Sequence, residues 1–161
     1  MRVALLFCGL VGAGAVTAGG QTPLPPTVPM PLRAHVQNER FQIVTSVRGL
    51  PLGVRDHLQS MFRQQVLEIA DPRAEYQASD DITKPRLPTR RLLTAGCSQD
   101  HCLVLYERGG YARSRHAALI HWTPAATRLE AGGTAPASLA TVDDIRKALL
   151  TGTIKGPARD W

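Results

Sequence analysis

The sequence predicts an α+β domain in which helices pack on an antiparallel sheet of about five strands. Apolar residues recur at helical spacing between residues 55 and 70, and strand-like segments separated by turn residues occupy positions 91 to 131. A second helical segment with its own cap follows at Thr141. The chain has 161 residues, which suits one domain built around one hydrophobic core.

The N-terminus has the features of an export signal. Arg2 precedes an apolar run that ends near Val16, and this run is shorter than the ~20 residues that a membrane-spanning helix needs. Small residues up to Ala18 suit a signal peptidase that cleaves before Gly19. We therefore expect residues 1–18 to be a signal peptide and the mature protein to be periplasmic or secreted, with no stable membrane span.

The next segment is rich in proline, which fixes an extended backbone and removes amide donors. Residues 19–32 are accordingly expected to be a tether, and residues 33–161 a single α+β domain. The tether prolines are Pro23, Pro25, Pro26, Pro29 and Pro31.

Two helices are expected in the first half of the domain. The spacing of Phe41, Val44 and Val47 predicts a short helix over residues 40–47, although the β-branched content also suits a strand. The clearest helical pattern covers residues 55–70 and stops before Pro72.

In the second half of the domain, the sequence predicts an antiparallel meander with turns at Gly109-Gly110 and Thr123-Pro124. The expected strands are residues 91–95, 103–107, 116–122 and 127–131. A last helix begins at Thr141, carries two aspartates in its first turn and ends before Gly152, and residues 155–161 are expected to be irregular.

Loss of the signal removes Cys8 and leaves one cysteine pair, Cys97 and Cys102. In an oxidising compartment such a pair forms a disulfide, and two cysteines facing each other across a hairpin satisfy its geometry. The sequence therefore predicts a disulfide-closed hairpin tip. Its rigidity suits either of two roles, a partner-binding loop or a purely structural crosslink. The residues of the candidate loop are Ser98, Gln99, Asp100 and His101.

Other chemistry has weaker support. The Cys-x-x-x-x-Cys spacing lacks the helix-start context of thiol-redox sites. A zinc site would need three or four ligands, and Cys97, His101, Cys102, His116 and His121 have suitable side chains. However, His116 and His121 are five residues apart on one expected strand and so face opposite sides of the sheet. We expect no metal and no cofactor. An enzyme would have to use Glu107, His116 or His121 as a catalytic residue. For Glu107 we favour a structural role, a solvated ion pair at a turn.

The charge pattern argues against nucleic acid as a partner. The formal net charge is +6, but the cations are scattered along the chain and form no basic tract. We therefore expect a protein partner, and the sequence does not decide whether the chain forms a homodimer.

The order of motifs resembles the periplasmic lysozyme inhibitors of the Ivy family (inhibitor of vertebrate lysozyme). The matching pieces are residues 41–49, the Leu-Pro-x-x-Val motif at 50–54, the strand at 92–95, the Cys-x-x-x-x-Cys loop at 97–102, the strands to 131 and the Leu-Thr-Gly motif at 150–152.

In that family the loop histidine enters the lysozyme cleft and hydrogen-bonds the two catalytic carboxylates. The resemblance implies that His101 has this role, with Asp100 beside it. An imidazole donor suits a site of paired carboxylates. We therefore expect a noncatalytic protein-binding domain whose partner is a lysozyme or lytic transglycosylase. The alternatives are an envelope protein with another partner and, less favoured, a small periplasmic hydrolase.

Overall fold

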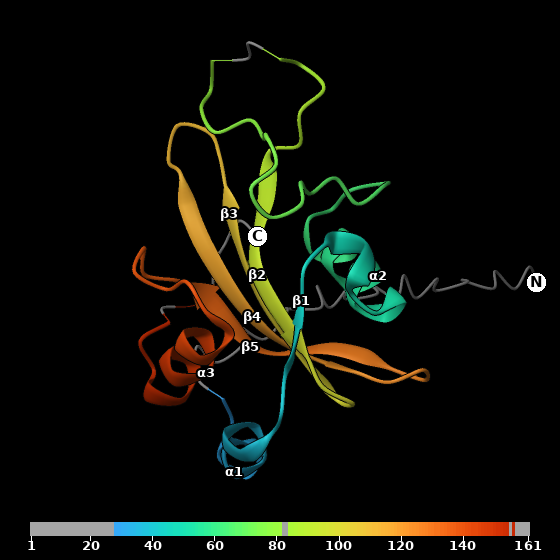
Figure 1. Cartoon of the computed structure of the whole chain (residues 1–161), viewed down its shortest axis with the longest axis vertical. Helices are drawn as coiled ribbons and strands as arrows, with labels where there is room; N and C mark the ends of the chain where they lie inside the picture. The colour runs from blue at the N-terminus through green and yellow to red at the C-terminus, as the bar shows by residue number, and fades with distance from the viewer. Residues whose placement is uncertain (1–27, 82–83, 155, 157–161) are drawn as a thin grey trace, which may run out of the picture.

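The computed structural model describes residues 28–81, 84–154 and 156. In this part of the chain five strands form one antiparallel sheet in the order β1-β2-β3-β4-β5, accompanied by helices (Figure 1). The predicted α+β class is therefore confirmed. The elements are α1 Met30–Asn38, β1 Gln42–Val44, the 3₁₀ helix η1 Val47–Gly49, α2 Leu52–Met61, β2 Arg90–Cys97, β3 His101–Arg108, β4 Ser114–Trp122, β5 Thr127–Thr134 and α3 Val142–Thr151.

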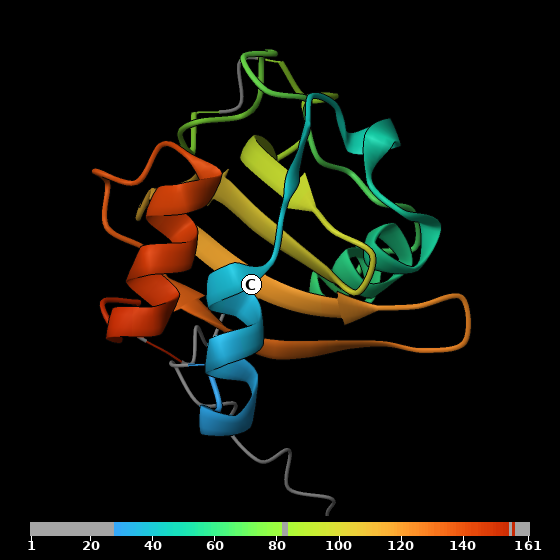
Figure 2. The same ribbon diagram turned by 60° about the horizontal axis from the view of Figure 1, so that its bottom comes forward.

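The sheet is covered on both faces, with α3 on one and α2 on the other (Figure 1). Leu103 pairs with Leu119 on the α3 face, and Val104 pairs with Ala118 on the α2 face. The central strand β3 is consequently buried along all but its last residue. The helix α1 lies beside α3, so both cover the same face of the sheet (Figure 2).

The last helix follows its sequence signals. The Thr141 side chain accepts a hydrogen bond from the Asp144 amide, and the Asp144 carboxylate accepts from the Thr141 amide, which forms a capping box. Gly152 ends the helix with φ 75°, a left-handed conformation that glycine adopts without a steric penalty.

The short helix predicted over residues 40–47 is wrong. The segment contains β1, a bend and the start of η1 instead. Ile43 and Val44 are β-branched, and pairing with Gly96 and Ala95 of β2 satisfies backbone groups that a short isolated helix would satisfy less well.

The helix predicted over residues 55–70 is displaced. It begins at Leu52, next to Pro51, and ends at Met61. Arg63 then has a positive φ of 55°, which a continuing helix cannot accommodate. The chain from 62 to 70 is irregular but still apolar on its inner side, and Phe62 and Ile69 are buried there.

The N-terminal boundary also differs from the expectation. Val28 is buried and α1 starts at Met30, so these residues of the predicted tether belong to the folded part of the chain. The expected signal peptide and Cys8 lie outside the described residues, as does most of the tail at 155–161. In the described part, no helix is both long and apolar enough to cross a membrane.

Candidate functional site

The predicted disulfide is present between Cys97, at the end of β2, and Cys102, near the start of β3. The two residues are register partners in the sheet, and their Cα atoms lie 4.1 Å apart. The amide of Ser98 donates a 2.8 Å hydrogen bond to the carbonyl of His101 and closes the turn. The disulfide-closed hairpin tip is therefore confirmed.

The tip is folded against its neighbours. Ser98 Oγ accepts hydrogen bonds from the amides of Asp100 (3.2 Å) and His101 (2.9 Å) and donates to the carboxylate of Glu39. The amide of Trp122 in β4 donates to the Asp100 carbonyl at 2.8 Å. These contacts fix the conformation of the loop, but they also hold it close to the domain surface.

The four candidate loop residues therefore differ in accessibility. Gln99 is exposed, and Ser98 and Asp100 are half-buried. His101 is only 3% exposed and belongs to β3. Its imidazole points inward, so Gln99 and Asp100 are the loop groups that a partner would meet first.

Glu39 is the partner of His101, and nothing in the sequence singled it out. The helix α1 ends where the Glu39 amide donates to the His35 carbonyl at 3.0 Å, and the extended backbone of Glu39 then directs the chain into β1. Its carboxylate lies 3.0 Å from His101 Nδ1 and 3.7 Å from His35 Nε2. The Glu39 side chain is 8% exposed, so it is a buried acceptor between two histidines.

Three histidine rings stand in a row across this end of the sheet. The ring centroids of His35 and His101 are 5.3 Å apart, and those of His101 and His121 are 5.1 Å apart. His101 and His121 are direct partners on β3 and β4. Glu130 of β5 completes the group, because its carboxylate lies within 4.8 Å of a nitrogen of each of these two histidines.

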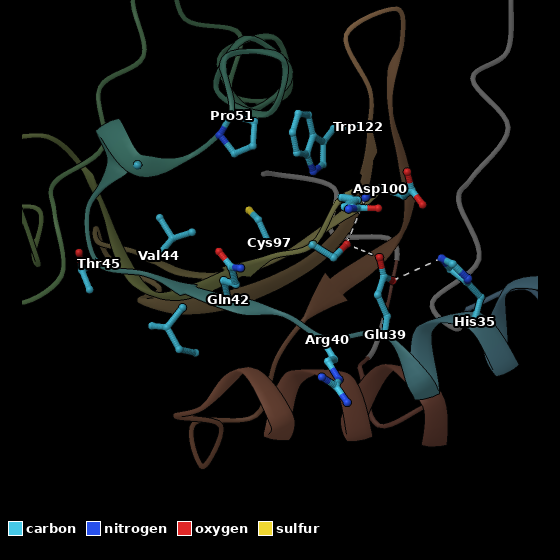
Figure 3. A pocket seen from close by; sticks show the side chains of 14 residues that line it. His35, Glu39, Arg40, Gln42, Val44, Thr45, Pro51, Cys97, Asp100 and Trp122 are labelled. Carbon is cyan, nitrogen blue, oxygen red and sulfur yellow. Dashed lines mark hydrogen bonds and ion pairs between the residues drawn. The ribbon is translucent and has the colours of Figure 1, made fainter.

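A pocket of about 810 Å³ opens between β1, the hairpin tip and the start of α2 (Figure 3). Gln42 and Val44 point from β1 toward it, while Trp122 and Pro51 lie across from the strand (Figure 3). Both polar and apolar side chains line it, including the exposed Gln99 and the half-buried Asp100 of the candidate loop. The pocket and the candidate loop thus form one continuous surface.

Glu107 does not form the solvated ion pair expected from the sequence. Its side chain is 0% exposed and forms ion pairs with Arg91 and with Arg113, whose Nη2 lies 2.6 Å from the carboxylate. Burial alone would raise the pKa of Glu107, but hydrogen bonds from Arg113 and Arg91 outweigh it and lower the pKa below 4.5. Arg91 also lies over the ring of Tyr76 at 4.4 Å. The carboxylate is therefore a structural anion.

The residues considered for an enzyme do not converge. His116 is buried against Tyr106, with ring centroids 5.2 Å apart, and contacts Ser114 Oγ at 2.8 Å. His121 lies five residues further along β4 and, as the alternation predicted, on the opposite face of the sheet. His121 instead lies opposite His101 on the neighbouring strand. The sequence argument compared histidines along one strand only and so did not find this contact.

A scan against protein-family models, a search of curated proteins and a search of solved structures each found no match. The site is accordingly interpreted from its geometry. The sequence reasoning did not place His35, Glu39 or Glu130 in the site, and it favoured a helix over the strand alternative where β1 lies. His101 and His121 were both noted in the sequence, but their pairing across the β3–β4 hairpin was not predicted.

Proposed function

We propose that the chain is an exported, noncatalytic protein-binding domain that takes an extended segment of its partner along β1. The observation that carries this proposal is the position of β1, an edge strand with a pocket on each face of the sheet. The pocket beside the hairpin tip measures about 810 Å³, and a second pocket of about 400 Å³ lies between β1 and α3. Ile43 and Arg40 contribute to both.

An edge strand suits this type of binding. Within the described residues β1 has one neighbour, β2, so its outer side is available to pair with an added strand. Successive side chains of such a strand alternate between the two faces, and pockets on both faces can therefore select them. Ile43 is 63% exposed and supplies apolar surface that a partner would bury.

The edge is also held in place before binding. Gln42 of β1 is the register partner of Cys97, next to the disulfide, and Ser98 ties the tip to Glu39 just before β1. A preformed edge loses little conformational entropy when a partner pairs with it. The disulfide thus supports the binding surface as well as the hairpin.

The partner class follows from the resemblance to lysozyme inhibitors and is part of this proposal. A lysozyme or lytic transglycosylase is the first class to test, with Gln99 and Asp100 on the rim as contact groups. Because His101 faces inward, the role of its imidazole differs from the insertion into a lysozyme cleft that the resemblance implies. It supports the loop from behind, and its insertion into a cleft would require the tip to open.

The test uses random dodecapeptides displayed on phage, selected on the purified oxidised protein, together with inhibition assays on a vertebrate-type lysozyme and a lytic transglycosylase. Ile43→Lys should weaken the selected peptides at least ~10-fold, because burying such a side chain contributes roughly 1.5–3 kcal/mol. Hydrogen exchange should slow at β1 amides when peptide is bound.

Val66→Lys is the matched control, since Val66 is 71% exposed and lines neither pocket. Equal affinities of both variants, or protection confined to another strand, would contradict the proposal. A dimer that Ile43→Lys dissociates would mean that a second copy of the chain occupies the edge.

A further inference from the structure

We propose that His101, His121 and Glu130 bind one divalent transition-metal ion of the zinc type, with Glu39 orienting His101 from behind. The three proposed ligands line neither pocket beside β1, although Glu39 lines both, and the proposal does not rest on the proposed function. It joins three neighbouring strands, β3, β4 and β5, at the end of the sheet covered by α1.

The first argument is an unsatisfied nitrogen. His101 is 3% exposed, and its Nε2 is buried without a hydrogen-bond partner among the described residues. Its other nitrogen, Nδ1, lies 3.0 Å and 3.2 Å from the two carboxylate oxygens of Glu39. A buried polar atom without a partner is costly, so an imidazole held in this way indicates a missing ligand.

The second argument is the arrangement around that nitrogen. Metal-binding histidines usually donate their second N–H to a carboxylate, which fixes the tautomer and aims the free lone pair at the metal. Glu39 is placed to accept the proton of Nδ1, which leaves Nε2 of His101 for the metal. The pair thus has the geometry of a carboxylate, histidine and metal triad.

The third argument is the donor set. One nitrogen of each histidine and one oxygen of Glu130 all lie within 4.8 Å of one another. Ligands of a single tetrahedral zinc lie about 3.3 Å apart, as follows from bond lengths of about 2.0–2.1 Å. Side-chain rotation can supply this contraction because Glu130 and His121 are only partly buried. Imidazole with one carboxylate favours zinc-type ions over magnesium or calcium, which prefer oxygen.

A β-bulge supplies Glu130. Leu119 pairs with Ala131 and Ile120 pairs with Leu129, so Glu130 is the extra residue between them. Such insertions redirect a side chain and bend the strand locally. Glu130 Oε1 lies 2.6 Å from Arg128, but this arginine is 61% exposed, and so weak a surface pair can leave the other oxygen to a metal.

A second group, His35, Glu39 and His101, also has ligand-type atoms within 4.8 Å. It would use Nδ1 of His101, which Glu39 already satisfies, and would leave Nε2 without a partner. The site with His121 and Glu130 satisfies both nitrogens of His101. We therefore assign the metal to that side.

The test is calorimetric titration of the oxidised protein, purified without a histidine tag, with Zn²⁺ alone. One ion should bind per chain, and Mg²⁺ should not compete. His121→Ala and Glu130→Gln should each weaken binding at least ~10-fold, and Glu39→Gln should weaken it roughly 10–100-fold at unchanged stoichiometry. His57→Gln is the control, because His57 lies in α2, outside the cluster.

The ¹⁵N NMR chemical shifts of the imidazole nitrogens distinguish metal binding from a purely structural role of these histidines. Zn²⁺ should shift Nε2 of His101 and one nitrogen of His121 and leave the signals of His57 in place. The absence of saturable binding up to ~100 μM Zn²⁺ would overturn the proposal. So would affinity that survives in His121→Ala but is lost in His35→Ala, provided that circular dichroism shows both variants folded.

Discussion

Replacing Glu107 by glutamine removes the charge on which Arg91 and Arg113 converge near the end of β3. Hydrogen bonds to charged groups contribute about 1.5–3 kcal/mol each. The two arginine side chains are 24% and 54% exposed, so solvent screens part of this interaction and hydrates the guanidinium groups once the carboxylate is gone. We therefore expect Glu107→Gln to lower the free energy of unfolding by about 2–3 kcal/mol.

Thermal unfolding followed by circular dichroism should show a fall in Tm of roughly 10 °C for a domain of this size. Glu75→Gln is the matched control, because Glu75 forms an exposed pair with Lys84 in which both side chains are more than half accessible. That change should cost less than ~0.5 kcal/mol. If the two variants unfolded at the same temperature, the buried position of Glu107 would have no energetic consequence and the reasoning would fail.

Three further predictions concern stability. The pKa of Glu107 is lowered below 4.5, so the ionised carboxylate stabilises the folded state fully above that pH and progressively less as the pH falls through its folded-state pKa. In urea titrations from pH 5 to 3, the free energy of unfolding should therefore fall less steeply for Glu107→Gln than for the unaltered protein. Replacing both Cys97 and Cys102 by alanine opens a short ring and should cost about 2 kcal/mol by chain entropy, and an unchanged urea midpoint would contradict this. Thr141→Ala removes the helix cap and should cost about 1 kcal/mol in the same assay, whereas exposed Thr134→Ala should cost less.

The parts of the fold that were predictable depend on local sequence. The strands of the meander, the cap at Thr141 and the stop at Gly152 each arise from residues close in the chain. The hairpin disulfide was predicted because the expected loss of residues 1–18 would leave a single cysteine pair. The helix 55–70 was misplaced because apolar residues at helical spacing continue past Arg63, where the backbone turns left-handed.

The candidate site was less predictable because it depends on pairing across the chain. Glu39 lies 62 positions from His101, and no local pattern links them. A turn at Gly109-Gly110 was expected between strands 103–107 and 116–122, whereas both strands extend further toward the turn, β3 to Arg108 and β4 from Ser114. The register of this hairpin places His101 opposite His121, and the expected strand bounds did not specify it. The bulge at Glu130 likewise has no signature in the sequence of β5.

The outer edge of β2 is covered in two short pieces. β1 pairs with residues 95–97, and Ala70 exchanges backbone hydrogen bonds of 2.9 Å with Arg90 and Leu92 further along. A long bare strand at this edge would be a template for intermolecular sheet growth. These two pieces leave a ladder of only three residues facing outward at β1, which limits the length of strand that can pair there. A chain shortened before Leu50 would lack β1 and leave residues 95–97 of β2 as an uncovered edge, so we expect it to associate more readily at high concentration.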